Sequence, residues 1–94
     1  IWWGFKVQDL NDVIIRALEL KVKQGVIITQ IEPGSSADKA GLKTEDVIIR
    51  VGNMSISNTN AIIKILEDMD VQVGDSIELL IIRDKKEQKI NMKL

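Results

Sequence analysis

The stretch from residue 76 to residue 94 most constrains what this chain can fold into. Its first half, residues 76–83, is rich in isoleucine and leucine, and its second half, residues 87–94, alternates apolar and polar side chains. The polar run Asp84-Lys-Lys-Glu87 between them is typical of a hairpin tip. Because two strands joined by so short a turn pair in antiparallel fashion, we expect an antiparallel sheet.

Four more runs of β-branched or apolar residues predict short strands. They cover residues 1–7, 25–31, 46–51 and 54–56. Gly52-Asn53, between the last two runs, fits a two-residue turn of type II′, in which glycine takes the first position. Strands are therefore expected to outnumber helices.

Helical spacing of apolar residues predicts two longer helices. The first covers residues 12–20, with Asp9 or Asn11 as its N-cap. The second covers residues 58–69, where Asn58 is a suitable N-cap, and its apolar stripe consists of Ile62, Ile65, Leu66 and Met69.

A short helix is expected after the Pro33-Gly34 turn. Ser35 or Ser36 can cap its start, and Gly41 is placed to end it. A Ser–Lys catalytic pair needs a buried base and an oxyanion site. Serines that open a short, exposed helix offer neither, so these residues are interpreted as structural.

Composition removes several functional classes. The net charge is −1, with 13 basic and 14 acidic residues spread along the chain, whereas nucleic-acid binding calls for a basic surplus on one face. The chain has no cysteine and no histidine, so thiol nucleophiles, disulfides, imidazole metal ligands and Ser-His-Asp relays are absent. No catalytic residues, metal or cofactor are therefore expected.

A chain of 94 residues is expected to form one domain, residues 1–94, since it contains no linker or repeat. No apolar stretch approaches the roughly 20 residues of a membrane-spanning helix. The start, isoleucine followed by two tryptophans, looks like that of a chain cut from a longer protein.

Four local patterns follow one another in an order that resembles a known family. They are Trp2-Trp3-Gly4-Phe5, the segment from Gly25 to Leu42, the segment from Asp46 to Val51, and residues 74–83. Together they resemble the bacterial, permuted PDZ domains of the HtrA/Deg serine proteases. The resemblance implies an α+β fold: a small PDZ-like, mostly antiparallel β-sandwich or partly open barrel of five to six strands, capped by two to three helices.

Two positions depart from the family pattern. The family usually has glycine before the aspartate at Asp46, and this chain has Glu45; its next hairpin usually reads Asn-Gly, and here it reads Gly52-Asn53. Both positions lie away from the groove that the resemblance implies, so they affect the shape of loops more than function.

The resemblance implies a loop that captures a peptide's terminal carboxylate. In the family an apolar-Gly-apolar loop precedes a strand and presents its backbone N–H groups; here it corresponds to Trp3-Gly4-Phe5, with Trp2 in front. A carboxylate needs several converging donors, and glycine lets the backbone curl without a Cβ in the way.

The same resemblance implies a groove beside this loop. The ligand is expected to add as an antiparallel strand along the segment from Phe5 to Gln8. The opposite wall is expected to be the long helix, and the groove residues are Val7, Asn58, Ile62 and Ile65. Burial of one apolar side chain, offset by ordering of the peptide, predicts an affinity on the order of micromolar.

Several of these residues have a second interpretation. Trp2 is as consistent with a covered interface as with the loop, whereas Trp3 fits the pocket or its framework better. Leu66 and Met69 are assigned to the core. Asn58 fits a helix cap best, which does not exclude ligand contact.

The leading hypothesis is a non-catalytic module that binds C-terminal ends with an apolar last residue. By resemblance it recognises substrates for, or regulates, a covalently attached serine protease domain in protein quality control at the bacterial envelope or periplasm, and the isolated domain is soluble. The alternative is a structural or assembly PDZ domain that docks a neighbouring domain of a protease or secretion component and takes no free C-terminus.

Overall fold

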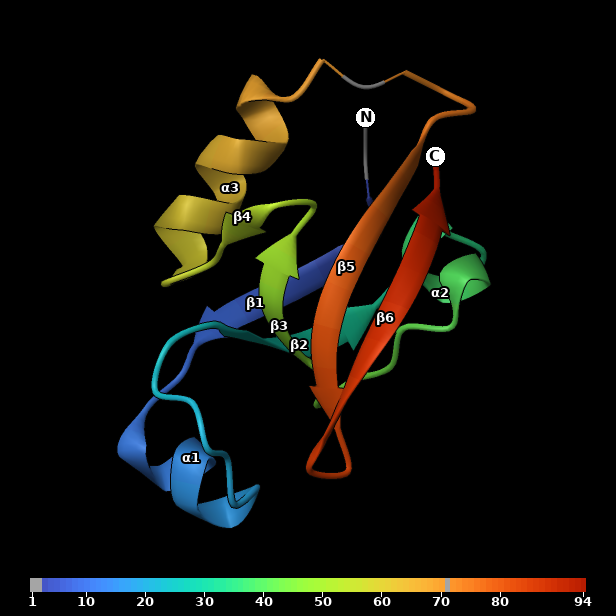
Figure 1. The fold of residues 1–94 in the computed structure, drawn as a ribbon. Coiled ribbons are helices and arrows are strands. Elements are labelled where there is room, and N and C mark those ends of the chain that lie inside the picture. Colours follow the sequence, from blue (N-terminus) through green and yellow to red (C-terminus); the bar gives the residue numbers. More distant parts are fainter. Residues whose placement is uncertain (1–2, 71) are drawn as a thin grey trace.

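An antiparallel sheet organises the structure, a computed structural model that describes residues 3–70 and 72–94. Within those residues six strands and three helices follow in an order that Figure 1 traces by colour. The elements are β1 (Phe5–Asp9), α1 (Asp12–Ala17), β2 (Val26–Ile31), α2 (Ser36–Ala40), β3 (Val47–Val51), β4 (Met54–Ser55), α3 (Thr59–Asp68), β5 (Ser76–Arg83) and β6 (Lys86–Lys93).

The strands lie in the order β1-β2-β3-β5-β6, and β4 pairs with β3 alongside this path. β5 and β6 pair along their whole length, from Ser76 opposite Lys93 to Arg83 opposite Lys86, so the predicted hairpin is confirmed. β1 and β6 are the two edges of the sheet. The PDZ-like α+β fold that the resemblance implied, with an antiparallel sheet and three helices, is therefore confirmed.

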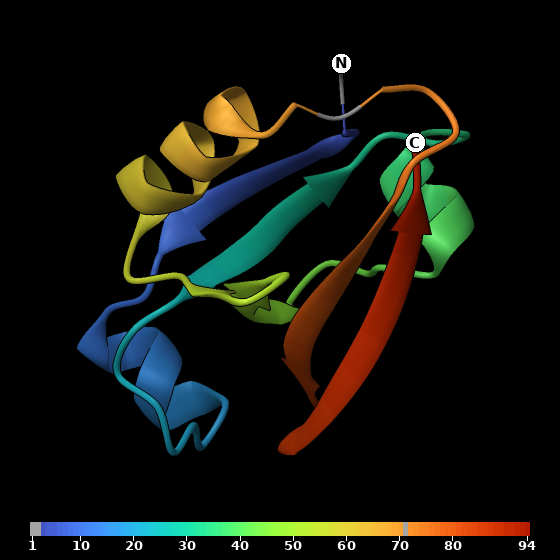
Figure 2. The same ribbon diagram turned by 45° about the horizontal axis from the view of Figure 1, so that its top comes forward.

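The core has two parts, on opposite sides of the sheet. The larger contains Trp3, Phe5 and the fully buried Ile62 of α3, with the inward-facing side chains of the strands. The smaller forms where Ile27, Val47 and Ile82 meet the apolar residues in and around α1. Figure 2 shows α3 beside β1, whereas α1 lies beyond the end of β1 and the start of β2. Thus α3 closes the main core and α1 covers the smaller one.

The caps agree closely with the sequence. Ser35 caps α2, Asn58 caps α3, and Gly41 ends α2 in the left-handed region. Asn11, not Asp9, caps α1, with its side-chain oxygen 2.9 Å from the N of Ile14. Ser35 Oγ accepts a hydrogen bond from the N–H of Asp38, as an N-cap serine does.

Two elements have bounds that differ by more than one residue from those predicted. The first strand covers Phe5–Asp9 and leaves out Trp3 and Gly4, because Gly4, with φ 95°, turns the chain immediately before it; the predicted residues 1 and 2 lie outside the described residues. The first helix ends at Ala17 rather than at residue 20. There Glu19 adopts φ 52°, and Leu18 and Leu20 pack on the smaller core instead of continuing the helix. In both cases a backbone reversal overrides an apolar pattern.

Candidate functional site

A groove of about 720 Å³ lies between β1 and α3. Its apolar lining comes from both walls: Trp3, Phe5 and Val7 on the strand side, and Ile62, Ile63, Leu66 and Met69 on the helix side. Lys6, Thr59 and Glu67 complete the lining. The rings of Trp3 and Phe5 are 6.5 Å apart at their centroids and form the floor near the start of the strand. The groove is therefore apolar inside, with one charge of each sign among its described lining residues.

The two walls run in opposite directions. Asp9, at the end of β1, accepts a hydrogen bond from the N–H of Thr59, the first residue of α3, at 2.7 Å. Figure 2 shows α3 beside β1 with its first turn at the end where the β1 arrow points. Trp3 and Met69 consequently line one end of the groove, and Val7 and Thr59 line the other.

The strand that borders the groove has an unpaired edge. The N–H of Glu32 donates to the carbonyl of Gly4 at 2.8 Å, and Phe5 lies opposite Ile31. In an antiparallel ladder this bond identifies Phe5 and Ile31 as a non-hydrogen-bonded pair, whose own N–H and C=O groups point away from each other. The Phe5 N–H and C=O therefore face the free edge of β1, where an added strand would pair.

The turn before β1 is held tightly from behind. The carbonyl of Trp3 accepts a hydrogen bond from the N–H of Ala37 at 3.0 Å, which ties the turn to α2. Gly4 has φ 95°, and a Cβ built on it would lie 2.1 Å from the Cβ and the Oγ of Ser35. Only glycine fits this conformation and this contact. The position of the turn is thus set by the segment that links β2 to α2.

Four of the residues predicted for the site come together at the groove. Trp3, Phe5, Val7 and Ile62 all line it. Gly4 lies in the turn between the first two of them, next to Ser35. Trp3 is also 5% exposed and belongs to the main core, so it serves as both floor and framework.

The other predicted residues lie elsewhere. Asn58 is outside the lining and caps α3, accepting a hydrogen bond from the N–H of Ala61 at 2.9 Å. Ile65 is half-buried against the main core rather than in the groove. The predicted role of Trp2 falls outside the residues that the structure describes.

Sequence reasoning missed part of the helical wall. Ile63 and Thr59 line the groove and were not proposed at all. Leu66 and Met69 pack against the core, as predicted, and they also line the groove. A helix that packs beside a strand presents two adjacent rows of side chains to the cleft between them, one toward the core and one at the solvent-exposed rim. The spacing of Thr59, Ile63 and Glu67 at i, i+4 and i+8 was the available signal.

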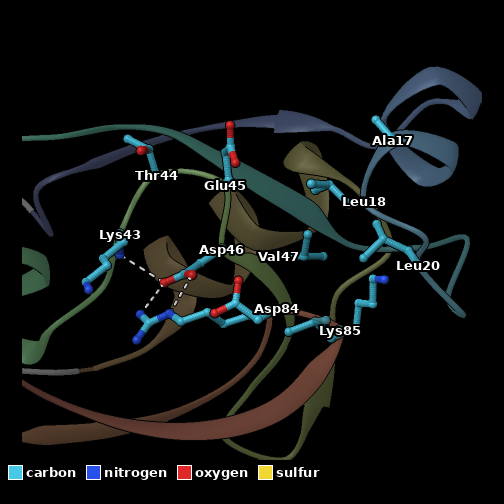
Figure 3. A pocket seen from close by; sticks show the side chains of 12 residues that line it. Ala17, Leu18, Leu20, Lys43, Thr44, Glu45, Asp46, Val47, Asp84 and Lys85 are labelled. Carbon is cyan, nitrogen blue, oxygen red and sulfur yellow. Dashed lines mark hydrogen bonds and ion pairs between the residues drawn. The ribbon is translucent and has the colours of Figure 1, made fainter.

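A second pocket, of about 330 Å³, lies between α1 and the tip of the β5–β6 hairpin (Figure 3). Its most buried charge is Asp46, 2% exposed, which accepts hydrogen bonds from the Nε and Nη2 of Arg83 at 2.9 and 2.6 Å and from the N–H of Lys43 at 2.9 Å. The hydrogen bond from Arg83 to Asp46 raises the pKa of that guanidinium. These groups satisfy one another's hydrogen-bonding capacity. We therefore interpret the ion pair as structural and the pocket as an opening beside it.

Residues 3–70 and 72–94 contain no group of three or more acidic, histidine or cysteine side chains placed to hold a metal ion. Over the same residues, no helix has the length and apolar character needed to cross a bilayer.

Comparisons with known proteins connect this fold to one family. The chain matches the PDZ domain family over residues 3–94. It is 33% identical over 91 residues to a probable periplasmic serine endoprotease DegP-like of Rickettsia conorii, covering 97% of this chain and 18% of the relative. The chain thus spans about a fifth of the length of such relatives.

Two solved structures share the fold at low identity. The HtrA3 PDZ domain bound to a phage-derived ligand (FGRWV) superposes with a TM-score of 0.79 at 12% identity, over 98% of this chain and 82% of that one. The HtrA-type protease AlgW with a decapeptide gives a TM-score of 0.80 at 18% identity, over 98% of this chain and 28% of that one.

These matches confirm the resemblance drawn from the sequence. A PDZ domain is a non-catalytic module of HtrA proteases, in line with the absence of a catalytic relay expected from the composition. From the family match over residues 3–94 and the similarity to DegP-type relatives, the chain belongs to the PDZ domain family, as a PDZ domain of the HtrA/Deg type.

Proposed function

We propose that the groove between β1 and α3 binds the C-terminal end of a protein chain. The ligand adds as an antiparallel strand to the free edge of β1, along the segment from Phe5 to Gln8. The observation that carries this proposal is the combination of an unpaired strand edge, which the backbone N–H and C=O of Phe5 face, with an apolar cleft of about 720 Å³ beside it. A strand with a dry cleft beside it supplies both backbone pairing and a side-chain pocket.

The ligand's terminal carboxylate is assigned to the turn at Trp3, Gly4 and Phe5. Gly4 adopts φ 95° there, a conformation that lets successive N–H groups converge on an anion. Since this turn lies at the Met69 end of the groove, the last side chain enters among Trp3, Phe5, Leu66 and Met69, with the fully buried Ile62 behind them. Preceding residues then run toward Ile63 and Thr59. Of the two isoleucines predicted for the groove, this arrangement uses Ile62 and not Ile65.

An apolar last residue is favoured because the lining at that end is apolar. The ligand in the HtrA3 PDZ structure ends in valine, which supports the same class of ligand for this chain. Burying one such side chain contributes about 1.5–3 kcal/mol, part of which is lost in ordering the peptide. We expect dissociation constants on the order of micromolar.

The proposal is tested with peptides that end in Leu, Val or Phe, each made as a free acid and as an amide. Trp3 lines the groove, so its fluorescence reports occupancy. We expect the acids to bind at least about tenfold more tightly, since a charge-assisted hydrogen bond contributes about 1.5–3 kcal/mol. Equal affinity of acid and amide would contradict the carboxylate mechanism.

A docking role against a neighbouring domain remains the alternative and makes a different prediction. Under our proposal, amide chemical shifts along Phe5 to Gln8 move on addition of peptide. Shifts that stay fixed with every peptide tested, together with binding of a neighbouring domain, would favour docking.

We further propose that residues 1–94 act as one PDZ domain attached to a serine protease domain, and that it recognises substrates or regulates the protease in the bacterial envelope. The support is the similarity to proteins named as periplasmic serine endoproteases. Reading the coding sequence on either side of this segment tests it: a His/Asp/Ser protease domain is expected upstream, and its absence would contradict the assignment.

A further inference from the structure

The hydrogen bond between Asp9 and Thr59 joins the two walls of the groove. Asp9 Oδ1 lies 2.7 Å from the N of Thr59, although the residues are 50 positions apart. Within residues 3–70 and 72–94, no other hydrogen bond or ion pair connects β1 with α3. Elsewhere the two elements meet through apolar side chains, which pack without fixing direction.

The corner around this bond is where three elements meet. Asp9 pairs with Val26 at the start of β2, and the N–H of the preceding residue, Gly25, donates to the carbonyl of Ser57 at 3.2 Å. Ser57 lies two residues before Thr59. The first turn of α3 is therefore anchored at this corner, while Met69 at its other end is held by apolar contacts.

The pairing of β1 with β2 is irregular in the middle of the strand. The register of β1 against β2 shifts between Lys6 and Val7, and the hydroxyl of Thr29 donates to the carbonyl of Lys6 at 3.3 Å in the irregular region. A bulge of this kind bends a strand and increases its twist. The far half of β1 still pairs with β2 up to Asp9, opposite Val26, and its direct polar link to α3 is the Asp9–Thr59 hydrogen bond.

We propose that Asp9 is a positioning residue that sets the spacing of the groove and thereby its affinity for ligand. Its carboxylate is not needed as a cap for α1, because Asn11 performs that role. It satisfies instead a first-turn N–H of α3, where carboxylates are favoured. Without this hydrogen bond, β1 is joined to α3 only by apolar contacts and, indirectly through β2, by the Gly25–Ser57 hydrogen bond. The spacing of the groove that suits a ligand then becomes one of several. This inference rests on the proposed function.

The first test replaces the acceptor. We expect Asp9→Ala to weaken binding of a Leu-ending peptide by about 5- to 10-fold, which corresponds to a ligand-ready population of roughly 10–20%. Asp9→Asn keeps a side-chain oxygen at the same reach, so its affinity should stay within about twofold of wild type. Asn11→Ala is the matched control, since it removes the cap of α1 away from the groove, and it too should bind within about twofold.

The second test removes the donor. Thr59 is the first helical residue after the cap Asn58, a position that suits proline, and Asn58 is already extended as proline requires of its predecessor. Thr59→Pro therefore deletes the N–H while keeping the helix start, and Thr59→Ala keeps the N–H while removing the side chain. Thr59→Pro should bind the Leu-ending peptide about 5- to 10-fold more weakly than Thr59→Ala, the same loss of affinity as expected for Asp9→Ala relative to wild type. Adding Asp9→Ala to Thr59→Pro should have no further effect.

The outcomes separate the two levels of inference. If the wild type binds peptide and Asp9→Ala binds equally well, or if Asp9→Asn is as weak as Asp9→Ala, the positioning role is wrong and the proposed function stands. If the wild type binds no C-terminal peptide, the proposed function fails and this inference fails with it. Should Asp9→Ala fail to fold, the comparison of Thr59→Pro with Thr59→Ala decides the question by the same criterion.

Discussion

The backbone of Gly4 packs directly on the side chain of Ser35, the N-cap of α2, so closely that a Cβ on Gly4 would lie 2.1 Å from the Ser35 Cβ. The turn that begins β1 is thus supported by the segment that follows β2. The sequence indicated that the turn needs glycine for its backbone conformation. The structure adds a steric reason, because no other residue leaves room for the cap.

The first prediction concerns Gly4→Ala. Strain in the left-handed region costs roughly 1–2 kcal/mol, and the overlap with Ser35 adds a comparable amount, so we expect about 3 kcal/mol of lost stability and loss of peptide binding. Gly34→Ala is the control, since Gly34 also has positive φ, 78°, but has nothing within 4 Å of its Cβ position. It should lose only about 1 kcal/mol in urea unfolding. Equal losses for both variants would contradict the steric argument.

The second prediction separates ligand contact from stability at the rim of the groove. Ile63 lines the groove and is 50% exposed. Ile63→Ala should change stability by less than about 0.5 kcal/mol and weaken peptide binding by roughly fivefold, because the lost apolar contact with the ligand is worth about 1 kcal/mol. Met54→Ala is the matched control: Met54 is equally exposed but lies on β4, outside the groove. An unchanged affinity for Ile63→Ala would remove Ile63 from the ligand's path.

The third prediction concerns the departure from the family pattern at Glu45. Glu45 has φ 74°, so a residue with a Cβ occupies the left-handed region where the family usually has glycine. Glu45→Gly should stabilise the domain by about 1 kcal/mol, which raises the melting temperature by roughly 4–8 °C for a domain of this size. Thr44→Gly, at a neighbouring residue without positive φ, should lower it. A lower melting temperature for Glu45→Gly would show that the carboxylate has a compensating role.

The fourth prediction tests the ion pair behind the second pocket. Arg83→Ala removes both side-chain hydrogen bonds to the buried Asp46 and leaves the one from the N–H of Lys43, and breaking such a pair costs about 3 kcal/mol. Lys85→Ala breaks the exposed pair with Glu19 and should cost less than about 1 kcal/mol. Chemical denaturation measures both. Peptide affinity should stay unchanged in Arg83→Ala, since this pair lies outside the groove.

Local patterns in the sequence predicted most of the elements and their caps. Ser35, Asn58 and Gly41 act where short-range rules placed them, because capping and turn formation depend on residues within three or four positions. The bounds of β5 were also predicted correctly from its apolar run and the polar tip that follows it. The first helix was predicted too long, because its last apolar residues belong to a core that forms only when distant strands meet.

The spacing of apolar residues along the chain did not predict all the residues that line the groove. Apolar spacing identified one stripe on α3. Ile65 and Leu66 both pack on the core, but the spacing did not show that only Leu66 of the two also lines the groove. That distinction depends on the rotation of the helix about its axis relative to β1. Asp9 is a second example, since it looked like a cap for the nearby helix and is bonded to a residue 50 positions away.

By itself, the sequence determined the family, the order of strands and helices, the caps, and the need for glycine at the turn before β1, since each depends on residues close together in the chain. Only the tertiary structure decided which face of α3 borders the groove, in which direction α3 runs relative to β1, and which side chains join the two walls of the groove. These features depend on the packing of segments far apart in sequence, and apolar contacts and hydrogen bonds across that distance leave no periodic signal in a single chain.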